Sequence, residues 1–295
     1  MSHTITHDTR PRWPDGARCA VWVSFDVDGP TAVTDDKQHG VLDDISLFND
    51  AANGIYRGLP AILQALTDFE VPSTFFIPSK NVEQWPTAFE AVRDAGHELG
   101  QHGYLHELFS SESVDRQQEI LARSFEIFDH YLGVRTKAFR SPGGDPTPET
   151  PKLLLEAGFE YTSIMRGDDR PATWLIDGAT TDLVEICAHW ELDDYHQFIY
   201  ADSPQLPPSL DRISSIRGTH DNWRREFDGY YRYGLTYTLM LHPEISGRPA
   251  NLRALRELLA YMRSKPDVWF ATGSQIANWW RTSGQSAENM IEVTA

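Results

Sequence analysis

Cysteine is scarce in this sequence: among 295 residues there are only Cys19 and Cys187. Each lies in an apolar run, CAVWVSF and LVEICA, where a small buried thiol is more common than a disulfide. We therefore expect two buried free thiols, which fit a reducing compartment.

Basic residues are also few relative to acidic ones. The chain has 26 Lys and Arg against 43 Asp and Glu, which gives a formal net charge of -17. Phosphate backbones and anionic membrane surfaces bind to positively charged faces. The composition therefore argues against nucleic acid and membrane partners.

Long apolar runs are absent as well. No run approaches the ~20 residues that a membrane-spanning helix needs. The polar N-terminal segment MSHTITHDTRPRWPDGARC has no apolar region of the kind found in secretory signal peptides. We expect a cytoplasmic protein, and an enzyme in that compartment would act on a small molecule or an oligosaccharide rather than on a wall polymer.

What the sequence does contain is a regular alternation of short β-branched or aromatic runs with longer amphipathic stretches. This rhythm is typical of β/α units around a parallel sheet, so we predict an α/β fold. The expected strands span 19–25, 73–77, 97–101, 136–139, 159–163, 183–187, 236–241 and 267–271, and the expected helices span 54–69, 84–95, 112–131, 149–157, 209–227, 251–263 and 273–281. The segments 164–182 and 203–208 are predicted to be surface excursions. No repeat or linker interrupts the chain, which favours one domain over 1–295.

Six ionisable residues follow directly on predicted strands. They are Asp26, Asp28, His102, His106, Arg140 and His242. In a β/α barrel the carboxyl ends of all strands share one rim, so residues far apart in sequence meet there. The sequence thus predicts an active site at that rim.

Two pairs have a spacing that suits a metal site. Asp26 and Asp28 are two positions apart, so on an extended backbone both side chains point the same way. His102 and His106 are one helical turn apart, which lets both imidazoles face one ion. Each pair alone is also compatible with a turn or a cap. Together with Asp28, however, the histidines form a two-histidine, one-carboxylate set with open coordination positions.

Arg140 and His242 complete the expected site. An arginine at a strand end favours a partner at the barrel mouth, and Asp26 is the obvious one, because such a pair fixes the carboxylate and keeps it ionised as a base. An imidazole at the rim is well matched to proton transfer near neutral pH.

These pieces, in this order, resemble the motifs of the polysaccharide deacetylase family, also called carbohydrate esterase family four. SFDVDG at 24–29 corresponds to the family's T-F-D-D-G motif and HGYLH at 102–106 to H-[ST]-x-x-H. RSP at 140–142 corresponds to R-x-P and LMLH at 239–242 to L-x-L-H. The resemblance covers residues 19 to about 282 and implies a distorted (β/α)7 barrel, usually assembled as dimers or tetramers.

The resemblance also implies a role for each residue. We expect Asp26 as general base, Asp28, His102 and His106 as ligands of zinc or another divalent metal, Arg140 as the residue that orients the base, and His242 as general acid. The WELDD segment at 190–194 looks like the family's aromatic and acidic motif, so either Asp193 or Asp194 should hydrogen-bond His242. Trp190, Tyr104 and Pro142 are expected to line the substrate pocket.

Two departures from the motifs leave alternatives open. Val27 separates the aspartates and Gly103 replaces the hydroxyl residue, as in a cytosolic branch that includes metal-independent allantoinases, cyclic imide hydrolases and one type of peptidoglycan deacetylase. The substrate is therefore an N-acetylated sugar or a small cyclic amide, and the expected location slightly favours the latter. A ferrous oxygenase also uses two histidines and a carboxylate, and an inactive barrel scaffold is the remaining alternative.

Overall fold

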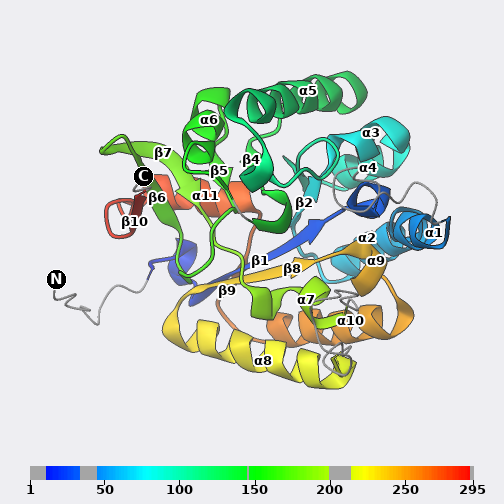
Figure 1. Ribbon diagram of the computed structural model, residues 1–295. Coiled ribbons are helices and arrows are strands. Elements are labelled where there is room, and N and C mark those ends of the chain that lie inside the picture. Colours follow the sequence, from blue (N-terminus) through cyan, green and yellow to red (C-terminus); the bar gives the residue numbers. More distant parts are fainter. Residues whose placement is uncertain (1–10, 34–44, 145, 199–213, 293–295) are drawn as a thin grey trace, which may run out of the picture.

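Parallel strands form a ring at the centre of the protein, and helices lie around them (Figure 1). The structure is a computed structural model and describes residues 11–33, 45–144, 146–198 and 214–292. The ring consists of β1 (Cys19–Asp26), β2 (Ser73–Ile77), β3 (Glu98–Gln101), β4 (Ala138–Phe139), β5 (Tyr161–Thr162), β7 (Ala179–Glu185) and β8 (Thr236–Leu241). Every neighbouring pair from β8 through β1 to β7 is parallel. A bridge between Asp193, beyond β7, and Met240 in β8 closes the ring. This is the predicted distorted (β/α)7 barrel.

The alternation of side chains along β1 explains how one strand serves both the core and the site. Its odd-numbered residues and Val27 are fully buried against the surrounding helices. Its even-numbered residues face the barrel interior, where Trp22 packs edge-on against Phe76 and Tyr161. Because the side-chain period of a strand is two, the same inward face continues upward through Ser24 to Asp26 at the rim.

Helices surround the barrel, with α5 and α6 on one side and α8 and α10 on the opposite side (Figure 1). Their bounds are α1 (Ile45–Asn53), α2 (Leu59–Asp68), α3 (Ser79–Gln84), α4 (Pro86–Asp94), α5 (Val114–Leu132), α6 (Thr150–Ala157), α7 (Asp194–Phe198), α8 (Ile216–Tyr233), α9 (Pro243–Ser246), α10 (Pro249–Arg263) and α11 (Gly273–Thr282). A π-helical turn, η3 (Gly54–Gly58), joins α1 to α2. Within the described ranges, no helix has the length and apolarity that crossing a bilayer requires.

Helix α11 closes the end of the barrel opposite the carboxyl ends of the strands. Glu98, at the start of β3, accepts hydrogen bonds from Thr74, from Tyr161 and from the backbone N–H of Ser274 in the first turn of α11. A carboxylate at a helix N-terminus satisfies free N–H groups and interacts favourably with the helix dipole. The base of the barrel is therefore a layer of polar groups that are hydrogen-bonded to one another.

Most strands lie where the sequence predicts them, and four predictions need correction. Residues 172–182, predicted as surface excursion, form much of an antiparallel hairpin of β6 (Ala172–Ile176) and β7, which β10 (Met290–Glu292) extends. The helix predicted at 54–69 begins at Ile45 as α1 and continues through η3 into α2. The helix predicted at 209–227 lies further along the chain as α8, which ends at Tyr233. The helix predicted at 84–95 is α4, and the short helix α3 that precedes it was not predicted. The predicted excursion at 203–208 lies outside the described residues.

The two cysteines are buried and unpaired, as predicted. Burial raises the pKa of each thiol to about 12. Neither is therefore a good nucleophile, since reactivity requires the thiolate.

Candidate active site

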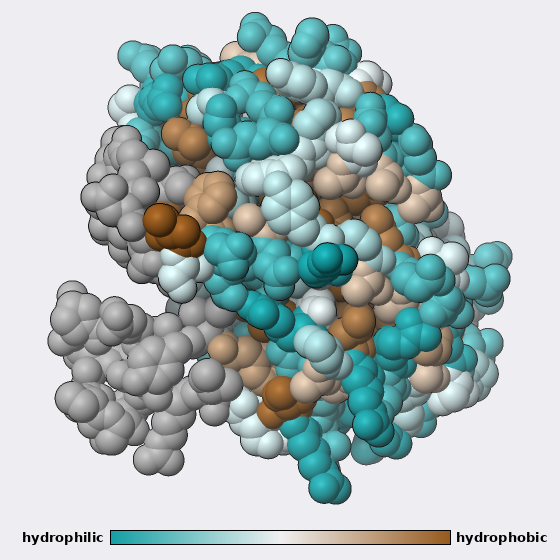
Figure 2. Space-filling view, turned by 90° about the vertical axis from the view of Figure 1, so that its right-hand side faces the viewer, coloured by the Kyte–Doolittle hydropathy of each residue, from teal (hydrophilic) through white to brown (hydrophobic). Residues whose placement is uncertain are grey.

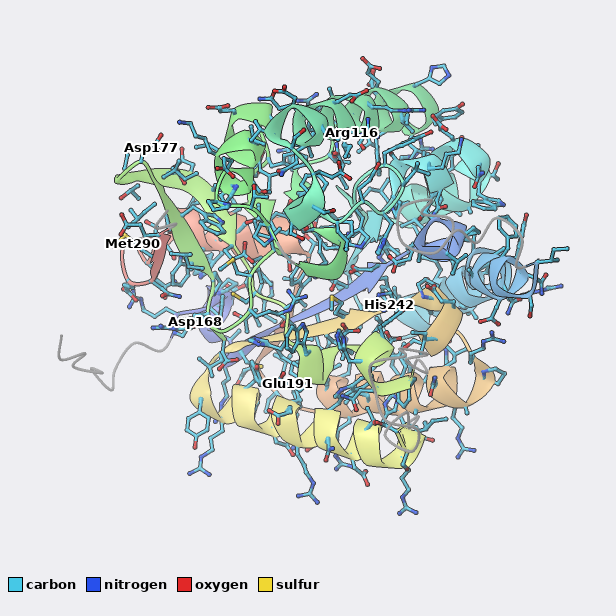
Figure 3. The ribbon with its side chains drawn as sticks, in the orientation of Figure 1. Arg116, Asp168, Asp177, Glu191, His242 and Met290 are labelled. Atoms are coloured by element: carbon cyan, nitrogen blue, oxygen red, sulfur yellow. The ribbon has the colours of Figure 1, made fainter. Side chains whose placement is uncertain are left out.

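The predicted polar residues meet at the rim formed by the carboxyl ends of the strands. Figure 3 shows one of them, His242, beyond the end of β8 and beside α9. In Figure 1 the arrows of β1 and β8 point to the same side, and Figure 2 views the molecule from that side. Hydrophilic residues cover most of this face, with apolar residues in small groups between them (Figure 2).

Arg140 pairs with Asp26 inside the barrel. Its Nη1 donates to Asp26 Oδ1 at 2.6 Å and its Nη2 to Ser24 Oγ at 2.9 Å, while Nε lies 3.3 Å from Ser163 Oγ. The guanidinium also lies over the ring of Phe76, at 4.3 Å from the ring centroid. Both charged groups are almost completely buried. The charge-assisted hydrogen bond fixes one oxygen of Asp26, Oδ1, and leaves Oδ2 free.

Asp28, His102 and His106 form a second cluster next to this pair. His102 Nε2 lies 3.4 Å from Asp28 Oδ1, and His106 Nε2 lies 3.4 Å from Asp28 Oδ2. The free oxygen of Asp26, Oδ2, is 3.7 Å from the same His102 nitrogen. One ligand atom from each of the three residues lies within 4.8 Å of the others. The predicted ligands are therefore brought together by two parts of the chain, the segment after β1 and the loop after β3.

A divalent cation fits this donor set. Asp28 is 3% exposed, yet its Oδ1 has no hydrogen-bond partner. An orphaned buried carboxylate oxygen is costly unless a cation or a donor neutralises it. His102 Nδ1 lies 2.8 Å from the backbone oxygen of Arg140, so this nitrogen carries the proton and Nε2 presents its lone pair to the cluster. Two imidazoles and a carboxylate are a donor set that suits zinc.

The histidines do not lie on a helical turn, which corrects the interpretation of their spacing. The chain from His102 to His106 is a loop in which Gly103 has φ +74° and His106 has φ +64°. The two rings still approach edge to face, with centroids 5.0 Å apart. Left-handed residues at two points bend the loop so that both imidazoles reach Asp28.

Glu107 holds this loop and was not predicted from the sequence. Its Oε2 accepts the backbone N–H groups of Tyr104 and Leu105 at 2.8 and 2.9 Å. A Cβ at position 103 would lie 2.9 Å from this oxygen. Gly103 is therefore required both by its positive φ and by the closeness of Glu107, which accounts for the departure from the hydroxyl residue of the motif.

The electrostatics of the cluster favour an ionised Asp28. Burial raises the pKa of this carboxyl, but the charge of His106 and the closeness of the His102 and His106 imidazoles outweigh burial and bring the pKa well below its ordinary value. An ionised, partly unpaired carboxylate is ready to bind a cation.

Asp194, and not Asp193, is the partner of His242. Asp194 Oδ1 lies 2.7 Å from His242 Nδ1, and its other oxygen accepts hydrogen bonds from the His242 backbone N–H at 3.0 Å and from Ser246 Oγ at 2.5 Å. Asp193 bonds instead to His196, at 2.7 Å. Burial lowers the pKa of His242, but the Asp194 carboxylate outweighs burial and raises the pKa well above its ordinary value.

Comparison with known structures identifies the family of this site. The chain superimposes on the crystal structure of a putative polysaccharide deacetylase from Mycobacterium smegmatis with a TM-score of 0.86 and 33% sequence identity, covering 97% of this chain and 96% of that one. The chain belongs to the polysaccharide deacetylase family.

Other comparisons agree with this membership of the polysaccharide deacetylase family. The family model for polysaccharide deacetylase matches residues 43–162. A peptidoglycan deacetylase from Helicobacter pylori is 28% identical over 261 residues, which cover 78% of this chain and 87% of that protein. An allantoinase structure shares the fold, with a TM-score of 0.79, 22% identity and 94% coverage of both chains.

The residues predicted to line the substrate pocket take different positions. Trp190 is 56% exposed and stacks on His196, with ring centroids 5.7 Å apart. Pro142 is buried and lies near Gly103. Tyr104 points between α3 and α5, where its hydroxyl lies 2.6 Å from Arg123 Nη2, so the structure does not place it with the cluster. The ring of Tyr195 does reach the site, 5.3 Å from that of His242.

Glu244 is a carboxyl near the site that sequence reasoning missed. Its Oε2 is buried without a hydrogen-bond partner. Burial first, and then the charge of Asp28, raise the pKa of Glu244 to about 8. The sequence did contain a signal for this residue, because Glu244 comes two positions after His242, the histidine at the end of β8.

Proposed function

We propose that this protein is a metal-dependent amide hydrolase that removes the acyl group from an N-acetylated sugar. The observation that carries the proposal is that the cluster of Asp28, His102 and His106 contacts an arginine-bound carboxylate, Asp26, at 3.7 Å and an aspartate-bound histidine, His242, at 3.6 Å. The similarity to a peptidoglycan deacetylase along most of the chain supports a sugar amide as substrate.

A divalent metal ion, zinc by its donor set, would be held by Asp28, His102 and His106 and would supply Lewis acidity, which makes a carbonyl more electrophilic and a water molecule more acidic. The chain's own residues then handle the protons. Asp26 would take the proton of the attacking water at Oδ2, because Oδ1 is occupied by Arg140.

His242 would donate a proton to the leaving nitrogen. Its Nδ1 is engaged by Asp194, so the transferable proton is on Nε2, which lies 3.6 Å from Asp28 Oδ2 and thus faces the cluster. The Asp194 carboxylate raises the pKa of this imidazole and so favours its protonated form. Water adds to the carbonyl carbon, the C–N bond breaks, and the products are a carboxylic acid and an amine.

The proposal is tested with the purified protein on N-acetylglucosamine oligomers, succinimide, hydantoin and allantoin, each with and without a chelator. We expect hydrolysis of the oligomers that stops in chelator and returns on addition of zinc. Ring opening of a cyclic substrate in place of deacetylation would contradict the proposed substrate, and full activity in chelator would contradict the metal.

Single substitutions distinguish the role of the proposed base from that of the proposed metal ligands. Asp26→Asn should lower turnover at least about a hundredfold with the metal still bound, because only the base is lost. His102→Ala should lose the metal. Asp129→Asn and His130→Ala, both exposed on α5, are the matched controls and should behave as wild type. Full turnover of Asp26→Asn would exclude this residue as the base.

A further inference from the structure

A second arginine, Arg166, lies at the mouth of the barrel and has no role in the proposed reaction. It follows β5 at the carboxyl end of that strand, on the same rim as the catalytic residues. The turn that carries it is fixed by Glu185 at the end of β7, whose Oε1 accepts the N–H groups of Ile164 and Met165, both at 2.8 Å. The backbone leading to Arg166 is therefore held by a buried carboxylate.

The guanidinium of Arg166 lies against the loop that follows Arg140. A Cβ at position 144 would be 2.4 Å from Arg166 Nη2 and 2.9 Å from its Cζ, so only glycine leaves room for the arginine. Gly144 has φ +85°, which also favours glycine. The loop and Arg166 thus fit each other closely.

Arg166 differs from Arg140 in its hydrogen bonding. Arg140 has acceptors for all three of its nitrogens. Arg166 has one long hydrogen bond, 3.3 Å from Nη1 to the backbone oxygen of Met165, and its Nε is buried without an acceptor. No carboxylate among the described residues lies within ion-pair distance of it. An unsatisfied buried donor on a cation is costly, so the guanidinium of Arg166 lacks the acceptors that would compensate for its burial.

The electrostatic surroundings place this cation near the reacting groups. Burial, followed by the charge of Arg140, lowers the pKa of Arg166, while Asp193, Glu185 and Asp26 act in the opposite direction. Asp193, Glu185 and Asp26 repel any anion, and they repel a dianion such as phosphate more strongly than a monoanion. A planar monoanion with two acceptor oxygens suits the edge of a guanidinium better.

We propose that Arg166 binds a carboxylate of the substrate, and that this protein therefore acts on N-acylated sugars that carry a carboxylate beside the scissile amide. This inference rests on the proposed amide hydrolysis. It makes Arg166 a specificity residue that contacts the substrate but not the bond that breaks.

The test compares three tetrasaccharides that differ only in charge or substituent. The first alternates N-acetylglucosamine and N-acetylmuramic acid, whose lactyl ether bears a free carboxylate. The second is the same compound with its carboxylates converted to methyl amides, and the third contains N-acetylglucosamine alone. Dissociation constants are measured calorimetrically with metal-loaded Asp26→Asn protein, and kcat/KM with metal-loaded protein that retains Asp26.

We expect the protein with Arg166 to bind the carboxylate form at least about tenfold more tightly than the methyl amide form. Arg166→Met should weaken binding of the carboxylate form about thirtyfold and of the two neutral forms less than about threefold, because only the charged hydrogen bond is lost. Arg166→Lys keeps the charge and should lie between. Arg253→Met, an exposed position on α10, is the control for net charge.

Equal weakening for all three compounds in Arg166→Met and Arg166→Lys would show a structural role and overturn the proposal. Equal binding of the carboxylate and methyl amide forms by protein with Arg166, or no binding of any of the three, would overturn it as well. If the carboxylate preference is found but no compound is hydrolysed, the proposed reaction fails while the carboxylate site stands. If the compounds are hydrolysed without any preference, the carboxylate site fails while the proposed reaction stands.

Discussion

The contact between η3 and α9 predicts that adding one methyl group at Gly58 will impair catalysis from outside the site. Gly58 has φ -63° and ψ -54°, so alanine suits its backbone. The obstacle is space: a Cβ there would lie 2.1 Å from the backbone oxygen of Pro243. Cβ atoms essentially never come closer than 3.0 Å to such an atom, so the two backbones must separate by about 0.9 Å.

The magnitude follows from the rigidity of both partners. Gly247 faces Gly58 from the other side, where its own Cβ would lie 2.3 Å from Gly58 Cα, so the contact is backbone against backbone. Overpacking of this kind costs ~1–3 kcal/mol. Pro243 directly follows His242, and a displacement near 1 Å of a catalytic group can lower the rate about a hundredfold. We expect kcat of Gly58→Ala to fall about 10- to 100-fold while the metal content stays unchanged.

Gly229→Ala is the matched control for this prediction. Gly229 lies within α8, and apart from its chain neighbours and the backbone of its own helix no atom lies within 4 Å of its Cβ position. Alanine should therefore stabilise the protein there by about 1 kcal/mol through helix propensity. For a chain of this size, about 2 °C of melting temperature corresponds to 1 kcal/mol. If Gly58→Ala matched Gly229→Ala in both melting temperature and kcat, the close packing of η3 on α9 would be refuted.

Two further predictions concern groups that act on the site residues. His242 has a raised pKa and stays protonated until the pH passes that raised value, so the alkaline limb of the kcat/KM profile should lie above pH 6.5. In Asp194→Asn the carboxylate that raises the pKa is lost, so the limb should move to lower pH. A limb that does not move in this variant would exclude His242 as the acid. Glu107→Gln should weaken metal binding about tenfold, measured by competition with a chelating dye, and should leave the melting temperature unchanged. The control Glu119→Gln, at an exposed position, should bind the metal as wild type does. Equal metal affinity in the two variants would show that Glu107 has no part in metal binding.

The parts of the fold that were predictable are those with one dominant signal. The strands 73–77 and 236–241 were predicted with the bounds that the structure shows, because each is a continuous buried run. The hairpin of β6 and β7 was missed because exposed polar residues fill the outer half of β7. Its signal was Asp177-Gly178, whose positive φ values form the tight turn between the two strands.

The candidate site was predictable in its composition but not in its local geometry. Strand ends identify which residues share the rim, since topology brings those ends together. The spacing of His102 and His106 suits a helical turn, but Gly103 in the left-handed region makes the segment a loop. Asp193 and Asp194 are adjacent, so only the direction of the chain entering α7 decides which one reaches His242.

The residues missed at the site share a physical reason for having been missed. Glu107, Glu185 and Arg166 belong to none of the four sequence motifs. Glu107 and Glu185 act through backbone N–H groups, and Arg166 has a buried nitrogen without an acceptor. Backbone hydrogen bonds leave no residue pattern in a sequence, because any carboxylate at any distance can accept them. A buried donor without an acceptor is likewise visible only in three dimensions. The features that distinguish this protein's substrate from that of its relatives are therefore expected among such residues, and the catalytic residues themselves carry little of that information.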